Sequence, residues 1–172
     1  MHDCFKVAVL GSTGFVGLEI IKILIKHPNV KINFLGTENS QNFNFKKFDI
    51  NFNSINLPSL NLNKDFDPSI SDVVFLALPH GVSHFYVKKY FNKIKIIDLS
   101  ADFRLDTIST YLNNYGQDHS CPELLSKFTY GLPEINKDFI VTNDNIAVPG
   151  CYPTSILLPL IPLLKNNLLK TD

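Results

Sequence analysis

Apolar residues in the first part of the chain follow first the spacing of a strand, then that of a helix, then that of a strand again. Residues 5–10 and residues 30–35 are short, apolar, β-prone runs, which is typical of strands. Between them the apolar positions recur at helical spacing, at Leu18, Ile21 and Ile25, and the repeat ends near Pro28. Residues 1–35 therefore predict one βαβ unit, whose crossover should be right-handed.

The alternation of strands and helices continues through the rest of the chain. Residues 73–78 are a continuous apolar run, as expected of a parallel strand buried on both faces, and further strands are predicted at 94–98 and 146–148. A helix is predicted at 82–91, a polar connection runs through Asp118, a helix begins at Pro122, and "YGLPEIN" is expected to form a loop. This order predicts an α/β fold with a Rossmann-like, mostly parallel sheet and helices on both faces.

Composition and charge exclude several classes of protein. Sixteen basic residues balance sixteen acidic ones without a basic block, which argues against a nucleic-acid partner. Three cysteines without paired spacing, and an N-terminus without a signal-peptide pattern, predict a cytoplasmic location. The most apolar segment, "SILLPLIPLL", is far shorter than the roughly 20 residues that span a bilayer, so no membrane contact is expected. The asparagine-rich residues 39–63 are interpreted as a surface connection.

Gly11, Gly14 and Gly17 form the pattern G-x-x-G-x-x-G between the first predicted strand and the first predicted helix. Glycines at such positions allow a tight turn, a close approach of the backbone to a pyrophosphate, and close packing of the helix on the strand. The free N–H groups at the helix N-terminus then favour the phosphates. We therefore predict dinucleotide binding in preference to a merely structural turn.

The end of the second predicted strand bears on the ribose of that dinucleotide. NAD-binding proteins place an Asp or Glu there to hold the 2′-hydroxyl. In this chain Thr37 occupies the corresponding place with Glu38 just after it, while Asn39 and Ser40 offer polar groups to a 2′-phosphate. The residues lean slightly toward NADP.

Four predicted loops follow carboxyl ends of strands, where open parallel sheets bind their ligands. They are the glycine loop, "LPHG", "DLSADFR" and "PGCYPT". In "LPHG", Pro79 and His80 are expected to line the cofactor crevice. His80 and His84 have the spacing of a zinc-binding pair, but no glutamate lies between them and no third ligand is evident, so no metal is expected.

Arg104 is the only arginine in a chain that contains fifteen lysines. A planar guanidinium can bind a phosphate or a carboxylate through two parallel hydrogen bonds, which lysine cannot do. A structural salt bridge would usually be served by lysine. We therefore predict that Arg104 recognises an anion.

Cys151 follows a predicted strand end and precedes a predicted helix start at Pro153. A helix N-terminus favours the thiolate and lowers the pKa of a cysteine placed there. Free cysteine is more often a small apolar core residue. The setting of Cys151, which Cys4 and Cys121 lack, makes it the candidate nucleophile.

Taken together, these motifs resemble N-acetyl-γ-glutamyl-phosphate reductase. The matching segments, in the family's order, are "VLGSTGFVG", "DVVFLALPHGVS", "IIDLSADFRL", "YGLPEIN" and "IAVPGCYPTS". Aspartate-semialdehyde dehydrogenase shares the plan of glycine loop, phosphate-binding arginine and cysteine, but "LPHGVS" with "GCYPT" resembles the acetylglutamyl enzyme.

The resemblance implies NADPH-dependent reduction of N-acetyl-L-glutamyl 5-phosphate to N-acetyl-L-glutamate 5-semialdehyde and phosphate, in arginine biosynthesis. Cys151 would form a thioester with the acyl group of this small-molecule substrate, and Arg104 would hold the phosphate. Backbone N–H groups at the helix start would stabilise the oxyanion. The residues implied to cradle the cofactor phosphates are Gly11, Ser12, Thr13, Gly14, Phe15 and Val16.

The chain departs from the resembled family in length. Members of that family are much longer, and their second half supplies the substrate domain, a general acid/base histidine and much of a dimer interface; here no histidine follows Cys151. Residues 1–147 are expected to form the NAD(P)-binding domain, and residues 148–172 the cysteine loop and helix that begin a substrate domain otherwise absent. Such a fragment or truncated product should bind cofactor poorly and turn over little or nothing, whereas the full-length protein should be a homo-oligomer.

Two alternatives remain beside this interpretation. The first is a related reductase, similar to aspartate-semialdehyde dehydrogenase, that acts on an aspartyl or a carrier-linked aminoadipyl phosphate. The second is a catalytically inert dinucleotide-binding module, which the missing histidine favours.

Overall fold

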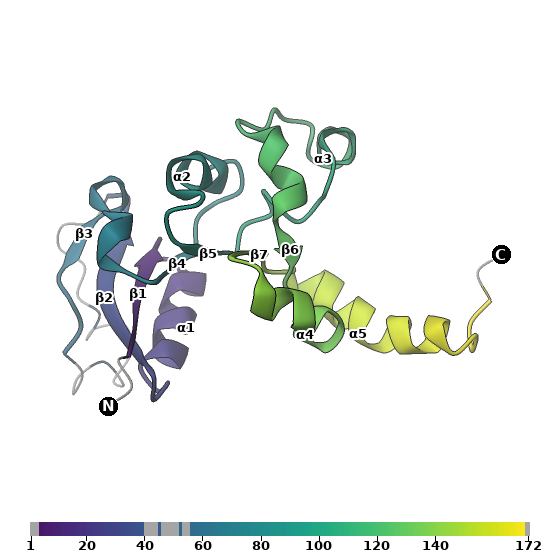
Figure 1. Ribbon diagram of the computed structural model, residues 1–172, viewed down its shortest axis with the longest axis horizontal. Helices are drawn as coiled ribbons and strands as arrows, with labels where there is room; N and C mark the ends of the chain where they lie inside the picture. The colour runs from purple at the N-terminus through teal and green to yellow at the C-terminus, as the bar shows by residue number, and fades with distance from the viewer. Residues whose placement is uncertain (1–3, 40–44, 46–51, 53–55, 171–172) are drawn as a thin grey trace.

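A sheet of seven parallel strands organises the computed structural model, which describes residues 4–39, 45, 52 and 56–170 (Figure 1). The strand order is β3-β2-β1-β4-β5-β7-β6, and every pairing is parallel. The strands are β1 (Phe5–Leu10), β2 (Val30–Thr37), β3 (Leu60–Leu62), β4 (Val73–Leu76), β5 (Lys95–Asp98), β6 (Thr129–Tyr130) and β7 (Asn145–Ala147). The predicted βαβ unit and the strands that follow it are thereby confirmed, with β4 two residues shorter than expected.

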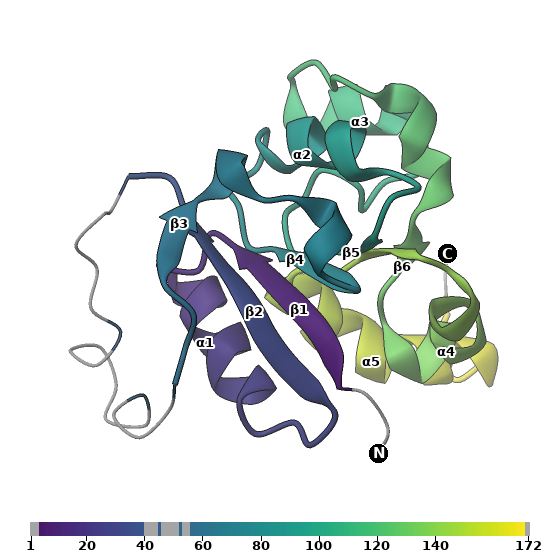
Figure 2. The same ribbon diagram turned by 60° about the vertical axis from the view of Figure 1, so that its left-hand side comes forward.

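Helices cover both faces of this sheet, as predicted. Side chains alternate across β1, so that Val7 and Val9 belong to one buried cluster and Ala8 and Leu10 to the other. The first cluster includes the buried face of α1 (Phe15–Leu24), and the second includes residues of α2 (Ser83–Tyr90) and α3 (Ile108–Tyr115). In Figure 2, α1 accordingly lies on the opposite side of the sheet from α2 and α3.

Two segments expected to be irregular form helices instead. The polar connection before Asp118 contains α3, because Thr107 caps its first turn by accepting a hydrogen bond from the N–H of Thr110 (3.2 Å), and Gly116 ends it in the left-handed conformation. The expected loop "YGLPEIN" supplies the end of β6 and then the start of α4 (Pro133–Thr142), since proline suits the first helical position. At Pro122 the predicted helix is a 3-10 helix, Pro122–Lys127.

The asparagine-rich connection is more than a surface loop. Its last residues, Leu60–Leu62, add the edge strand β3 beside β2, and Asn63 directly after them is only 2% exposed. Phe52 is buried in the same cluster as α1. The interpretation of residues 39–63 as a surface connection is therefore wrong for these parts, and residues 40–44, 46–51 and 53–55 lie outside the described residues.

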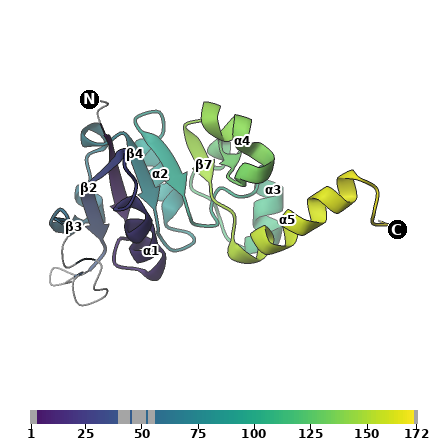
Figure 3. The same cartoon turned by 90° about the horizontal axis from the view of Figure 1, so that it is seen from below.

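The last helix, α5 (Cys151–Lys165), extends away from the sheet (Figures 1 and 3). Every residue of α5 is described, and none of them is buried. Its exposed apolar side chains include Tyr152, Ile156 and Leu163. Within the part of the chain that the structure describes, no helix is long and apolar enough to cross a membrane.

Gly17 provides a test of the packing of α1 on β1. A methyl group added there would overlap the carbonyl of Gly11 and would lie 2.8 Å from Ser12 Cα, and neither backbone group can rotate away. We expect Gly17→Ala to lower the free energy of unfolding by about 3 kcal/mol, measured by urea denaturation. In the control variant Gly14→Ala the nearest atom is 3.5 Å away, and the cost should be about 1 kcal/mol or less. Equal losses in the two variants would contradict this account.

Candidate functional site

The carboxyl edge of the sheet aligns the loops that carry the candidate residues. At the end of each of β1, β4 and β5, one more main-chain hydrogen bond continues the ladder of the sheet. These three bonds join Ala77 N to Leu10 O (2.9 Å), Leu99 N to Leu76 O (3.0 Å) and Val148 N to Asp98 O (2.8 Å). Each loop therefore begins in a fixed register with its neighbour. The glycine loop, the "LPHG" turn, the arginine loop and the cysteine loop all start at this edge, as the sequence predicts.

The glycine loop borders a cavity of about 690 Å³. Gly11 has a φ of +75°, and a methyl group on it would overlap the carbonyl of Ala77, so only glycine fits this turn. The predicted cofactor residues that line the cavity are Gly11, Thr13, Gly14, Phe15, Val16, Thr37 and Pro79. The structure thus brings together most of the residues assigned to the dinucleotide.

Two predicted cofactor residues, Ser12 and His80, do not belong to the described lining of the cavity. Ser12 is fully buried, and its hydroxyl donates to the carbonyl of Gly36 (2.8 Å). His80 does not belong to the described lining, and its ring packs against Tyr115 with ring centroids 4.5 Å apart. Ser40 lies outside the described residues.

The cavity suits a dinucleotide in two respects. Gly14 caps α1 without any side-chain hydrogen bond, and the first turn holds no acidic residue, so its N–H groups are available to an anion. Phe15 is 90% exposed at this first turn, which adds apolar surface beside the loop. The hydroxyl groups of Thr13 and Thr37, 2.9 Å apart, join the loop to the end of β2.

Asp102 connects the "LPHG" turn to the arginine loop, a role that reasoning from the sequence missed. This fully buried carboxylate accepts hydrogen bonds from the N–H of Gly81 (2.8 Å) and of His84 (3.1 Å), and its Oδ1 lies 2.7 Å from His80 Nδ1. Its own N–H donates to the hydroxyl of Ser100 (3.1 Å). The only available signal was its position inside "SADFR", two residues before the arginine.

His84 is an interior residue. It is buried, its Nδ1 accepts from the N–H of Ser120 (3.3 Å), and burial lowers its pKa. Nδ1 used as an acceptor and a lowered pKa both indicate a neutral imidazole. Among the described residues, no group of three or more potential metal ligands is found.

Arg104 is held at the carboxyl ends of two strands. Its Nε donates to the carbonyl of Val148 (2.8 Å), and its Nη2 donates to the carbonyl of Leu99 (2.9 Å). A methyl group built on Gly150 would lie 3.0 Å from Nη1, so the guanidinium packs directly against the residue that precedes Cys151. The structure thus brings the lone arginine next to the cysteine loop. Gly150 is a further site residue, required for this close approach.

Cys151 is the first residue of α5 and is exposed. The N–H and the hydroxyl of Thr154 both bond the carbonyl of Gly150, at 3.0 and 2.9 Å, and fix the first turn of the helix. Cys121, by contrast, is fully buried, and burial raises the pKa of its thiol to about 11. Cys121 therefore packs in the core, whereas Cys151 can meet a substrate.

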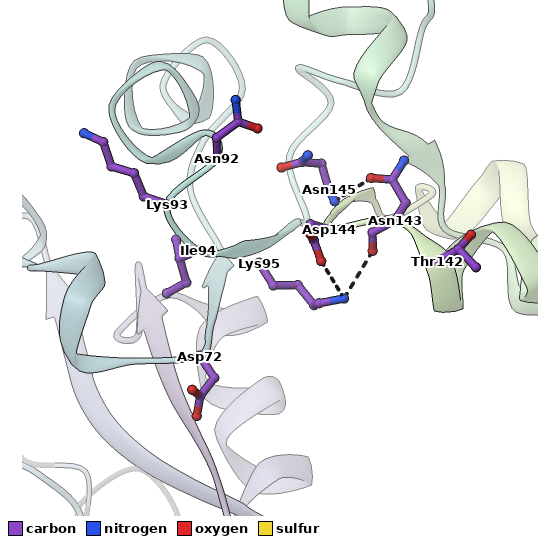
Figure 4. A pocket seen from close by; sticks show the side chains of 9 residues that line it. All are labelled: Asp72, Asn92, Lys93, Ile94, Lys95, Thr142, Asn143, Asp144 and Asn145. Atoms are coloured by element: carbon purple, nitrogen blue, oxygen red, sulfur yellow. Dashed lines mark hydrogen bonds and ion pairs between the residues drawn. The ribbon is translucent and has the colours of Figure 1, made fainter.

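A second cavity, of about 640 Å³, lies at the opposite edge of the sheet (Figure 4). It is bordered by residues at the amino ends of β4, β5 and β7. Lys95 bridges Asp144 (3.0 Å) and the carbonyl of Asn143 (3.3 Å), as Figure 4 shows. These polar groups pair with one another at the amino edge of the sheet, whereas the glycine, arginine and cysteine loops lie at the carboxyl edge.

Comparison with known proteins assigns the family. A family model described as "Semialdehyde dehydrogenase, NAD binding domain" matches residues 6–142. The chain belongs to this family. Membership agrees with the resemblance recognised from the motifs and with a nicotinamide dinucleotide as the cofactor class.

Curated relatives carry the name N-acetyl-gamma-glutamyl-phosphate reductase. One from Ehrlichia canis is 46% identical over 169 residues, which are 97% of this chain and 48% of the relative. One from Caldicellulosiruptor saccharolyticus is 42% identical over 172 residues, which are 97% of this chain and 49% of the relative. The chain therefore spans about half the length of the curated relatives that it matches.

Solved structures with the same fold are aspartate semialdehyde dehydrogenases. The Vibrio cholerae enzyme II complexed with ASA has a TM-score of 0.67 and 20% identity, and covers 95% of this chain and 47% of its own. The Candida albicans enzyme with NADP has a TM-score of 0.63 and 19% identity, and covers 95% of this chain and 48% of its own. At this level of identity the likeness concerns the fold.

Asp98, at the end of β5, makes the free energy of unfolding depend on pH. Burial raises its pKa to about 6, against the ordinary 3.8, although Ser100 donates to both carboxylate oxygens. The Asp98 carboxyl therefore keeps its proton to a higher pH in the folded protein than in the unfolded chain. Ionisation of Asp98 above that pH lowers the free energy of unfolding. Relative to Asp98→Asn, the wild type should lose about 2 kcal/mol of unfolding free energy as the pH rises from about 4 to about 7. Denaturant unfolding at both pH values measures this, and parallel behaviour of the two proteins would contradict it.

Proposed function

We propose that this chain carries the cofactor site and the nucleophile of an enzyme that reduces N-acetyl-L-glutamyl 5-phosphate to N-acetyl-L-glutamate 5-semialdehyde and phosphate, with NADPH as reductant, in arginine biosynthesis. The observation that carries this proposal is the juxtaposition of Arg104 with the loop of the exposed Cys151, at the same edge of the sheet as the cavity of the glycine loop. The names of the relatives at 42–46% identity support the choice of substrate.

Cys151 acts as the nucleophile in this mechanism. Its thiolate attacks the acyl carbon, a C–S bond forms, and the C–O bond to the phosphate breaks, so that the phosphate departs with the bonding electron pair and takes up a proton from solvent. The result is a thioester. The first turn of α5 begins at Cys151, and its N–H groups would stabilise the oxyanion that forms on the acyl carbon.

Arg104 holds the phosphate before it leaves. Nε and Nη2 are bound to main-chain carbonyls, which fixes the plane of the guanidinium and turns Nη1 toward the cysteine loop at Gly150. A fixed cation at this position binds the substrate phosphate and stabilises the charge that develops on it during departure.

The glycine loop, Thr13 and the first turn of α1 would hold the NADPH phosphates. Bound NADPH supplies the hydride that reduces the thioester carbon. The product is the oxyanion of a thiohemiacetal on Cys151; it re-forms the C=O bond as the C–S bond breaks, the C–S electron pair returns to the sulfur, and the aldehyde leaves. The Candida albicans enzyme of like fold is bound to NADP, which supports NADPH rather than NADH as the reductant.

A reductase for aspartyl phosphate is the second candidate, because the solved structures of like fold carry that activity in their names. Supplying N-acetylglutamyl, aspartyl and aminoadipyl phosphates in parallel separates the candidates. Consumption of NADPH with none of the three, despite cofactor binding, would favour an inert binding module.

Replacement of the nucleophile tests the mechanism. In the full-length protein carrying Cys151→Ser, we expect NADPH oxidation with N-acetylglutamyl phosphate to fall to background, because a serine hydroxyl is a far weaker nucleophile than a thiolate, while NADPH binding persists. The matched control is Cys4→Ser, which alters another exposed cysteine and should keep full activity. Absorbance of NADPH follows turnover, and undiminished turnover in Cys151→Ser would refute the assignment.

A conservative change at the arginine tests the anion site. In the full-length protein, Arg104→Lys keeps the positive charge but cannot bridge two carbonyls and a phosphate at once, so kcat/KM for the acyl phosphate should fall about 100-fold. The dissociation constant of NADPH should stay within about twofold of the wild type. An unchanged kcat/KM would assign Arg104 a purely structural role.

A further inference from the structure

The side chain of Asn63 is buried between the glycine loop and the end of β2. Its Oδ1 accepts a hydrogen bond from the N–H of Gly11 (3.1 Å), and its Nδ2 donates to Glu38 Oε2 (3.4 Å). Both ends of the amide are therefore engaged, one by the first glycine of the motif and the other by the first residue after β2. Asn63 also lines the cavity assigned to the dinucleotide.

Its position is fixed by the surrounding backbone. β3 ends at Leu62, which is paired with Thr37, so the next residue must emerge beside the end of β2. A methyl group on Gly36 would overlap Asn63 Oδ1, so the absence of a side chain at Gly36 makes room for the amide. The amide thus fills a space that the sheet leaves open only because residue 36 is glycine.

We propose that Asn63 is a positioning residue for the dinucleotide, an inference that rests on the proposed function. Without its Oδ1, the N–H of Gly11 loses its acceptor in a turn whose φ of +75° already requires glycine, and the loop can relax away from the geometry that receives the phosphates. Without its Nδ2, the Glu38 carboxylate at the rim of the cavity loses the donor that orients it.

Titration with NADPH, and separately with NADH, in a calorimeter tests the first half of this proposal. Asn63→Ala should weaken binding of both by about tenfold, since the loop geometry is common to the two nucleotides. The matched control is Asn61→Ala, because Asn61 lies on β3 just before Asn63, is exposed, and among the described residues its side chain bonds the nearby carbonyl of Ser59 (2.9 Å); the affinity of this variant should equal that of the wild type. Equal affinities for Asn63→Ala and Asn61→Ala would overturn the proposal.

A reversal of hydrogen-bond polarity tests the second half and separates it from a loss of folding. Asn63→Asp keeps an acceptor for Gly11 but sets a carboxylate against that of Glu38, so binding should weaken by about tenfold. Adding Glu38→Gln supplies an amide donor to the new carboxylate. Affinity in the double variant should return to within about threefold of Glu38→Gln alone.

The outcomes distinguish the two levels of inference. A full-length wild-type protein that binds neither NADPH nor NADH would refute the proposed cofactor site itself. A wild type that binds, together with an Asn63→Asp variant that Glu38→Gln does not rescue, would refute the positioning role of Asn63 alone. Circular dichroism of each variant identifies those that are folded, and only folded variants enter the comparison.

Discussion

Parallel pairing of β1, β4, β5 and β7 is the constraint on which the candidate site depends. In a parallel sheet all carboxyl ends face one edge, and the hydrogen bond that continues beyond each strand fixes where the next loop begins. Gly11 and Cys151 are thereby brought to one edge of the sheet although about 140 residues separate them in the sequence. The backbone pairing therefore determines where the loops of the candidate site lie, and side-chain contacts determine the geometry within it.

The sequence correctly predicts the elements whose formation is determined by residues within the same segment. Continuous apolar runs specify the central strands, because only a strand buried on both faces needs apolar residues at every position. Helix α3 gives little signal in the sequence because half of its residues are polar, and it is secured by the Thr107 cap and by the burial of Tyr111. The sequence predicts a loop at residues 130–136, which include the start of α4, because glycine and proline punctuate them; Pro133 suits the first turn of a helix as well as a loop.

The same distinction divides the site residues. Arg104, Cys151 and the glycines could be found from the sequence, because each is unusual in type or in spacing. Asn63 and Asp102 could not, because their roles consist of hydrogen bonds to residues distant in sequence: Asn63 bonds Gly11, 52 positions away, and Asp102 bonds Gly81, 21 positions away. Asn63 also lies in an asparagine-rich segment, and nothing in the sequence distinguishes it from the other asparagines there.

The two carbonyl contacts of Arg104 have a thermodynamic consequence. An arginine side chain on a surface samples many rotamers, and immobilising it on a ligand costs conformational entropy of about 0.5–1.5 kcal/mol. Here Val148 and Leu99 restrict the guanidinium as soon as the sheet is formed. That loss of freedom occurs during folding, so an anion of the kind proposed above would meet a group that is already ordered, and a larger share of the interaction energy would appear as affinity.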